Sequence, residues 1–228
     1  MSSLPILYSF RRCPYAIRTR MAMAVAAQDA EIREVLLRNK PEHMLEVGND
    51  GTVPILIMQT PPEPIDEAHD VSKVLENSLD IMDWALHVND PLHWLQNRHE
   101  SDLCTLLEIN DGPFKLALDQ YKYPTRFSNS EARGARERTI DFASAINGVL
   151  DHRRFLSGED LGFFDAAIFP FVRQWFAVDP RWSESLDLPH LLRWHHKMIK
   201  DFHFTTVMAK LNPWQPGDSP RRFLETLI

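Results

Sequence analysis

The stretch FRRCPYAIRTR, residues 10–20, decides how the first part of this chain is interpreted. It continues an apolar run at residues 5–10, PILYSF, whose β-forming side chains predict a strand. Beyond the cysteine, the apolar positions recur every fourth residue, at Ile17, Met21 and Val25. This spacing predicts a helix over residues 14–28. Cys13 therefore stands where a strand ends and a helix begins.

Cys13 is placed to react as a thiolate. A thiol attacks only in its ionised form, and free cysteine has a pKa of about 8.5. The start of a helix favours an anion, and Arg11 and Arg12 bring two cations next to the thiol, so we expect its pKa to be lowered. The following pair, Pro14-Tyr15, is typical of thioredoxin-like redox loops. The alternative is a small, buried, unreactive cysteine.

The motif contains no second cysteine. A dithiol oxidoreductase needs C-x-x-C to close an internal disulfide, and Ala16 occupies the second position here. The other cysteine of the chain, Cys104, stands among leucines and is interpreted as helix core. A single activated thiol fits thiol–disulfide exchange in which an external small thiol resolves the intermediate.

Strands and helices alternate over the first 88 residues. Further strands are predicted at residues 31–37, 53–58 and 71–75, and further helices at residues 41–47 and 78–86. Arg18 and Arg20 lie on other faces of the first helix than its apolar positions. Residues 59–70, with three prolines and four acids, are expected to form a projecting loop. The alternation predicts a small α/β domain at residues 1–88.

The second part of the chain, residues 92–228, is predicted to be an all-helical domain. Helices are expected at residues 92–108, 113–121, 130–150, 165–178 and 189–208. The many aromatic side chains between residues 163 and 176 are interpreted mainly as helix core. The tail, residues 211–228, is rich in proline and tryptophan and is expected to pack over the surface.

Two further signals lie in the first domain. A cis Val53-Pro54 bond would turn the backbone of Val53 outward to pair with a peptide ligand, whereas the alternative is an ordinary edge-strand proline. Asn77-Ser78 starts a helix, and Ser78 is predicted to be its N-cap. The free N–H groups there suit a carboxylate, and the alternative is a cap without a ligand.

Four motifs in the first domain resemble the glutathione transferase superfamily in order and spacing. They are CPYAIRTR at residues 13–20, LRNKPEH at residues 37–43, GTVPIL at residues 51–56 and NSLDIMDWAL at residues 77–86. The most similar class is the cysteine-dependent, omega-like one, with glutaredoxin-2-type bacterial proteins near by. In the second domain, FFDAAIFPFVRQW at residues 163–175 is similar to the buried helix of the family, with Asp165 as its capping aspartate.

The resemblance implies a thioredoxin-like domain followed by an all-α domain, with glutathione as co-substrate in the cleft between them. It implies that Cys13 faces the glutathione sulfur, that Val53 pairs with the cysteinyl backbone, and that Ser78 holds the γ-glutamyl carboxylate. Lys40 would approach the glycine end, because a tripeptide with two carboxylates needs a cation there. The remaining predicted glutathione-binding residues are Pro14, Tyr15, Pro54 and Asn77.

The chain departs from the family pattern at three places. Asn77 stands where the family has Glu or Gln, with Glu76 one position earlier. Gly162 stands where a serine or threonine usually precedes the capping aspartate. The connection at residues 59–70 is longer than the usual tight hairpin.

Composition excludes several classes of protein. The net charge of −7 argues against nucleic acid and against an anionic membrane as partners. No apolar run reaches the roughly 18 to 20 residues of a membrane span. The ten histidines show no metal-binding spacing, so no metal site is predicted. We expect a cytoplasmic protein without a signal peptide.

Three hypotheses for the function follow. The leading one is a glutathione-dependent thiol transferase that acts through Cys13 on mixed disulfides or on dehydroascorbate-like acceptors. The second is conjugation of glutathione to electrophiles, with Tyr8 or Ser9 supplying a hydroxyl. The third is a non-catalytic binding or regulatory protein with the transferase fold. The family resemblance also makes a homodimer possible.

Overall fold

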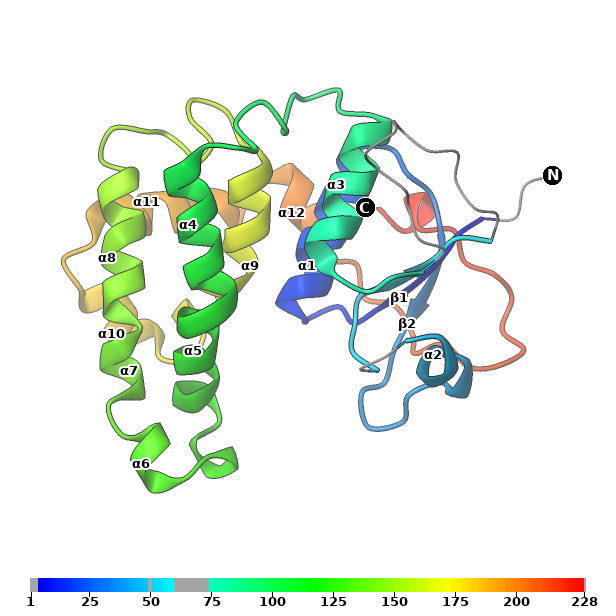
Figure 1. Ribbon diagram of the computed structural model, residues 1–228, viewed down its shortest axis with the longest axis horizontal. Coiled ribbons are helices and arrows are strands. Elements are labelled where there is room, and N and C mark those ends of the chain that lie inside the picture. Colours follow the sequence, from blue (N-terminus) through cyan, green and yellow to red (C-terminus); the bar gives the residue numbers. More distant parts are fainter. Residues whose placement is uncertain (1–3, 49–50, 60–73, 228) are drawn as a thin grey trace. The chain divides into compact units, whose positions relative to one another are not determined.

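The alternation of strands and helices predicted for the first domain is confirmed in the computed structural model (Figure 1). The structure describes residues 4–48, 51–59 and 74–227. The chain forms two units: the first consists of Met1–His93 and Asp201–Ile228, and the second of Trp94–Lys200. The last 28 residues thus group with the α/β unit, whereas the sequence placed them with the helical domain at residues 92–228.

The first unit is built on a sheet whose described strands have the order β2-β1-β3-β4. The strands are β1 at Ile6–Ser9, β2 at Glu31–Glu34, β3 at Ile55–Ile57 and β4 at Val74–Leu75. β1 runs parallel to β2 and antiparallel to β3, so Leu7 pairs with Ile32 on one side and with Leu56 on the other. Every residue of β1 is buried, as expected for a central strand covered on both faces.

The helices of the first unit are α1 at Pro14–Val25, α2 at Glu42–Val47, α3 at Ser78–Val88 and α12 at Phe202–Thr206. A 3-10 turn, η3, follows at Leu224–Thr226. α1 crosses over between the parallel strands β1 and β2 and packs chiefly on α3. Ten of the twelve residues of α1 are buried, including both arginines.

Part of the predicted loop and strand falls outside the described residues. The projecting loop at residues 59–70 is described only at Gln59, and the strand at residues 71–75 only at Val74–Leu75.

The tail runs along the outer edge of β2. Ile32 donates its N–H to the carbonyl of Arg221 at 2.9 Å, and Phe223 donates to the carbonyl of Ala30 at 2.7 Å. Asp29, just before the strand, accepts from the guanidinium of Arg222 at 2.7 Å. The tail therefore pairs with a sheet edge whose backbone groups would otherwise be open to solvent.

The second unit is helical throughout its regular structure. Its described helices are α4 at Ser101–Ile109, α5 at Lys115–Lys122, α6 at Asn129–Ala132, α7 at Ala135–Arg138, α8 at Ile140–Val149, α9 at Phe163–Phe176, α10 at Pro180–Ser185 and α11 at Pro189–Met198. A π-helical turn, η1 at Asn110–Phe114, joins α4 to α5, and a 3-10 turn, η2, spans Pro124–Arg126. The aromatic residues of α9 are buried core, as predicted.

Three predicted helices are shorter or divided. The helix predicted from residue 92 begins only at Ser101, after His93 adopts a left-handed backbone with φ of 55°. The helix predicted at residues 130–150 is interrupted where Gly134 has φ of 67°. The helix predicted at residues 189–208 stops at Met198, and Asp201 caps α12 as a separate helix. In each case a local backbone feature overrides the apolar spacing.

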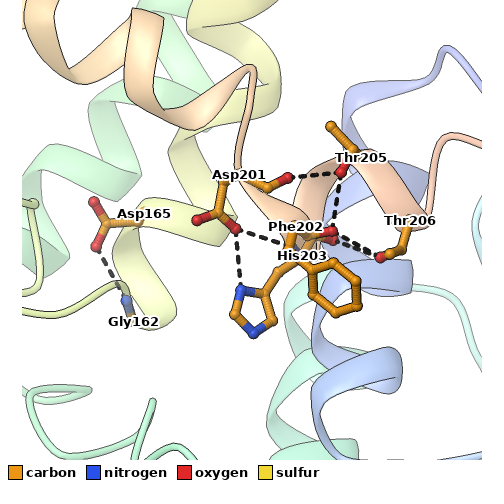
Figure 2. A network of polar contacts seen from close by, with 7 residues as sticks. All are labelled: Gly162, Asp165, Asp201, Phe202, His203, Thr205 and Thr206. Carbon is orange, nitrogen blue, oxygen red and sulfur yellow. Dashed lines mark hydrogen bonds and ion pairs between the residues drawn. The ribbon is translucent and has the colours of Figure 1, made fainter. Parts of the chain in front are cut away.

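Asp165 organises the start of α9 from within the second unit. Its carboxylate accepts N–H groups from Leu156 at 2.8 Å, from Ser157 at 3.0 Å and from Gly162 at 3.2 Å, the last of which is drawn in Figure 2. The indole of Trp194 donates to the same carboxylate at 2.8 Å. The capping aspartate predicted from the family motif is therefore confirmed.

Candidate functional site

Cys13 lies at the junction of β1 and α1. Its N–H donates to the carbonyl of Phe10 at 3.0 Å, and its own carbonyl accepts from Ile17 at 2.9 Å, so Cys13 is the N-cap residue of α1. The side chain is half-buried and forms no disulfide with Cys104. Pro14 occupies the first helical position, as predicted. The thiol is thus held at the amino-terminal end of a three-turn helix.

The structure brings Val53 next to this thiol. Cys13 Sγ lies 3.5 Å from the carbonyl oxygen of Val53 and donates to it. The Val53-Pro54 peptide bond is cis, as the sequence predicted. Val53 is buried in an apolar cluster against which the side chain of Cys13 also packs. The two signals that lie 40 residues apart in the chain therefore meet at one point.

A buried arginine fixes the loop that carries Cys13. Arg20 is 3% exposed and donates to Ser9 Oγ at 2.5 Å, to the carbonyl of Arg11 at 2.9 Å and to the carbonyl of Val207 at 3.1 Å. These bonds tie the end of β1 and the following loop to the carboxy-terminal segment of the same unit. No role in the site was predicted for Arg20 from the sequence.

Glu34 holds the same loop from β2. Its carboxylate accepts the backbone N–H of Arg11 at 2.9 Å. Burial raises the pKa of Glu34, while this N–H group and the charges of Arg20 and Arg11 oppose the rise. The guanidinium of Arg12 lies 5.8 Å from the centre of the Phe10 ring. The two arginines before Cys13 thus differ in surroundings, since Arg11 is linked to Glu34 and Arg12 is exposed.

The start of α3 differs from the sequence prediction. Asn77, not Ser78, is the N-cap, because the Asn77 side chain accepts the N–H of Leu79 at 2.8 Å. Ser78 is the first helical residue and is buried. Its hydroxyl oxygen accepts two N–H groups of Arg18, from Nε at 3.0 Å and from Nη2 at 2.8 Å. Asparagine and serine are about equally favoured as caps, so Asn77 can cap the helix while Ser78 accepts from Arg18.

The other predicted ligand-binding residues lie in the same unit. Tyr15 is half-buried beneath Arg18, whose guanidinium carbon is 5.0 Å from the ring centre. Lys40 lies beside the turn that leads to Val53, because its Nζ is 3.7 Å from where a Cβ on Gly51 would stand. Gly51 has φ of 56°, which favours glycine at this turn.

The two hydroxyls considered as alternatives to the thiol are buried and already bonded. Tyr8 donates to or accepts from His43 Nδ1 at 2.9 Å and accepts from Arg33 at 2.8 Å. Burial raises the pKa of Tyr8, against the lowering effect of Arg33. Ser9 is buried and accepts from Arg20. Both residues therefore serve the internal polar network of the first unit.

Cys104 belongs to the second unit, whereas the residues described above belong to the first. It belongs to α4, in the second unit, and its thiol donates to the carbonyl of Arg98 at 3.4 Å. It is half-buried and free.

Arg18 and Arg20 were not predicted as site residues, although the composition of α1 contains a signal for them. Apart from Tyr15 and Thr19, they are the polar side chains of a helix that is otherwise apolar all round. Such a helix is normally buried. An arginine within it must then be buried too and needs acceptors, which is the arrangement seen here.

The described residues include neither a metal-binding group nor a membrane-spanning helix. Among them, histidine, cysteine and carboxylate side chains form no group of three or more suited to a metal ion. None of the helices described has the length and apolar character needed to cross a bilayer.

Comparison with known proteins places these observations in context. Residues 7–91 match the family described as glutathione S-transferase, N-terminal domain. Glutathione S-transferase U19 of Arabidopsis thaliana is 23% identical, over 88% of this chain and 87% of that protein. Glutathione S-transferase omega-1 of Rattus norvegicus is 25% identical, over 86% of this chain and 76% of that protein.

A solved structure with the same fold contains ligand. It is a glutathione transferase family member from Pseudomonas fluorescens with two glutathione bound, with a TM-score of 0.74 and 16% identity. The match covers 91% of this chain and 93% of the other.

Proposed function

We propose that this chain is a member of the glutathione S-transferase superfamily and acts as a glutathione-dependent thiol transferase, with Cys13 as its catalytic residue. The observation that carries the proposal is the position of the Cys13 thiol at the start of α1, 3.5 Å from the backbone carbonyl of Val53. The helix start favours the thiolate over the thiol. The relatives named glutathione S-transferase omega-1, at 25% identity or less, support a glutathione-dependent transferase.

The proposed reaction has two exchange steps. The Cys13 thiolate attacks the glutathione sulfur of a mixed disulfide, forms a Cys13–glutathione disulfide and expels the acceptor thiolate, which takes up a proton. The thiolate of a second glutathione then attacks the glutathione sulfur of that disulfide. This step releases oxidised glutathione and restores the Cys13 thiolate. The mixed disulfide is reduced, and two glutathione units end in one disulfide.

Glutathione would be held by the groups around the thiol. In the proposal the backbone of Val53, next to Pro54, pairs with the cysteinyl part of the tripeptide, beside Pro14 and Tyr15. Ser78, with Asn77 before it, takes the γ-glutamyl carboxylate. Lys40, beside the turn at Gly51, takes the glycine carboxylate.

The competing conjugation reaction needs a hydroxyl that donates to the glutathione thiolate. The hydroxyls of Tyr8 and Ser9 are buried and bonded within the first unit, which favours the cysteine mechanism over them. Cys13 and Cys104 form no disulfide with each other, which agrees with a reducing compartment, and we propose the cytoplasm. A homodimer stays a prediction.

Intact mass after exposure to oxidised glutathione tests the proposal. We expect the wild-type chain to gain one glutathione, Cys13→Ser to gain none, and the matched control Cys104→Ser to gain one. We also expect Cys13→Ser to lose thiol transfer from a small mixed disulfide. An adduct that persists in Cys13→Ser, or full turnover by that variant, would overturn the proposal. A wild type that neither forms the adduct nor binds glutathione would favour a non-catalytic role.

A further inference from the structure

Arg18 and Ser78 form a buried polar pair between α1 and α3. The arginine is 1% exposed and the serine 3% exposed. Nε and Nη2 of Arg18 both donate to the same atom, Ser78 Oγ, at 3.0 and 2.8 Å. Arg18 lies within the motif CPYAIRTR, but the set of predicted ligand-binding residues does not include it.

The pair restricts what the Ser78 hydroxyl can do. A hydroxyl oxygen has two lone pairs and one proton. The two N–H groups of Arg18 engage both lone pairs, so the remaining function of the hydroxyl is to donate its proton. The Arg18 guanidinium polarises the hydroxyl to which it is bonded, and a polarised O–H donor suits an anionic acceptor such as a carboxylate.

The hydroxyl is also free of the capping role that the sequence suggested for it. Asn77 caps α3 by accepting from Leu79, so Ser78 Oγ is not needed for that purpose. Thr19 Oγ1, one residue beyond Arg18, lies 3.1 Å from the carbonyl of Tyr15 and 3.5 Å from that of Ser78. The contact with the carbonyl of Ser78 joins the first turn of α3 to α1, as the Arg18–Ser78 pair also does.

We infer that Arg18 is a positioning residue that sets the affinity for the γ-glutamyl carboxylate of glutathione by orienting and polarising the Ser78 hydroxyl. The inference rests on the proposed function, because it assumes that glutathione binds at Ser78. It adds Arg18 to the proposed site, as the residue that favours ligands with a carboxylate at their γ-glutamyl end.

Two ligands and four proteins test the inference by titration calorimetry. The ligands are S-methylglutathione, whose blocked sulfur prevents exchange at Cys13, and its analogue with the γ-glutamyl carboxylate converted to a carboxamide. The proteins are wild type, Arg18→Gln, Ser78→Ala and the double variant. We expect each single variant to bind S-methylglutathione about 10- to 100-fold more weakly, as for loss of a charge-assisted hydrogen bond.

Two comparisons distinguish positioning from a general defect. The double variant should bind no more weakly than Ser78→Ala, because Arg18 acts through Ser78. The carboxamide analogue should bind all four proteins with similar affinity.

In turnover, the KM for glutathione should rise in Arg18→Gln while kcat at saturation is kept. Arg18→Lys should recover part of the affinity. Arg153→Gln is the matched control: this arginine donates to Glu100 within the second unit, and its loss should leave binding unchanged.

Failure of the inference and failure of the proposed function give different results. A wild type that does not bind S-methylglutathione overturns both. Wild-type binding with unchanged affinity in Arg18→Gln, or additive losses in the double variant, overturns only the role of Arg18. Loss of folding in both Arg18→Gln and Arg18→Lys, measured by circular dichroism, would assign Arg18 to stability alone and overturn the inference as well.

Discussion

At the scale of single residues, His195 links stability to pH. Its ring is buried in the second unit and stacks on Phe176 with 3.9 Å between ring centres. Burial, with smaller contributions from His196 and Arg173, lowers the pKa of His195 to about 4. In the unfolded chain the same group titrates at about 6.5.

The sign of the pH dependence follows from this difference. Between pH 6.5 and 4 the unfolded chain binds a proton at His195 that the folded chain does not bind. The stabilising contribution is therefore complete above pH 6.5 and is lost as the pH falls to about 4, by roughly 3 kcal/mol at most. We expect His195→Leu to flatten this part of the stability profile, measured by urea unfolding from pH 4 to 8.

An exposed histidine supplies the control for that measurement. His99→Gln should keep the wild-type slope, because the side chain is exposed in the folded chain as in the unfolded one. If His195→Leu loses stability in acid as steeply as the wild type, another group is responsible for the slope.

The residues of the candidate site show how far sequence reasoning reaches. Cys13, Pro14, Val53 and Pro54 were found from local patterns, because a helix start and a cis proline leave signals in a few neighbouring residues. The exchange of roles between Asn77 and Ser78 was missed, because it depends on Arg18, which lies 60 residues away. Pairing between distant side chains leaves no local trace in a single sequence.

At the scale of elements, Ser157 and Gly162 share the capping of α9. Ser157 Oγ accepts the N–H of Phe164 at 3.2 Å, a bond that a serine or threonine at the N-cap would otherwise provide. A Cβ on Gly162 would stand 2.7 Å from Ser157 Cβ and 2.8 Å from its Oγ. Ser157 thus supplies the hydroxyl that Gly162 lacks, and the absence of a side chain at Gly162 leaves space for Ser157.

A double-variant cycle tests this exchange. Ser157→Ala should destabilise the protein by about 1 kcal/mol, as for loss of a cap. Gly162→Ser should cost about 1–3 kcal/mol through overpacking. The cycle combines Gly162→Ser with Ser157→Gly, which removes the obstructing side chain. The double variant should lose less stability than the sum of the losses in Gly162→Ser alone and in Ser157→Gly alone. The free energies come from urea unfolding, and simple additivity would contradict the proposed exchange.

Helix boundaries were the least predictable features at this scale. The spacing of apolar residues continues across residues 130–150, yet the helix is interrupted at Gly134, whose left-handed backbone separates α6 from α7. The apolar pattern records which residues face the core and not where the backbone turns.

At the scale of the whole molecule, the tail completes the first unit. Phe223 is 1% exposed, and its N–H bonds to Ala30 beside the edge of β2. Phe223→Ala should destabilise the protein by about 3–5 kcal/mol, as for truncation of a buried aromatic side chain. The amide of Ile32, which donates to Arg221, should then exchange faster with solvent deuterium.

Phe202 provides a matched control within the same carboxy-terminal segment. It is 71% exposed and sits in α12, whose start is capped by Asp201 (Figure 2). Phe202→Ala should leave both stability and the exchange of Ile32 unchanged. Equal effects of the two substitutions would show that the tail contact does not protect β2.

The overall architecture was predictable because ordered motifs and alternating elements identify the α/β half and the helical half. The grouping of the tail with the α/β half was not predictable, because the tail adds no regular strand. It pairs with β2 through isolated backbone bonds and one anchored ion pair, Arg222 with Asp29.

This arrangement has a consequence for how the protein is made. The ribosome releases β2 long before the segment that borders it, with all of Trp94–Lys200 emerging in between. At about 5–20 residues per second, the nascent sheet waits on the order of ten seconds with that side unpaired. During this interval the unpaired border of β2 is accessible to chaperones and to neighbouring nascent chains.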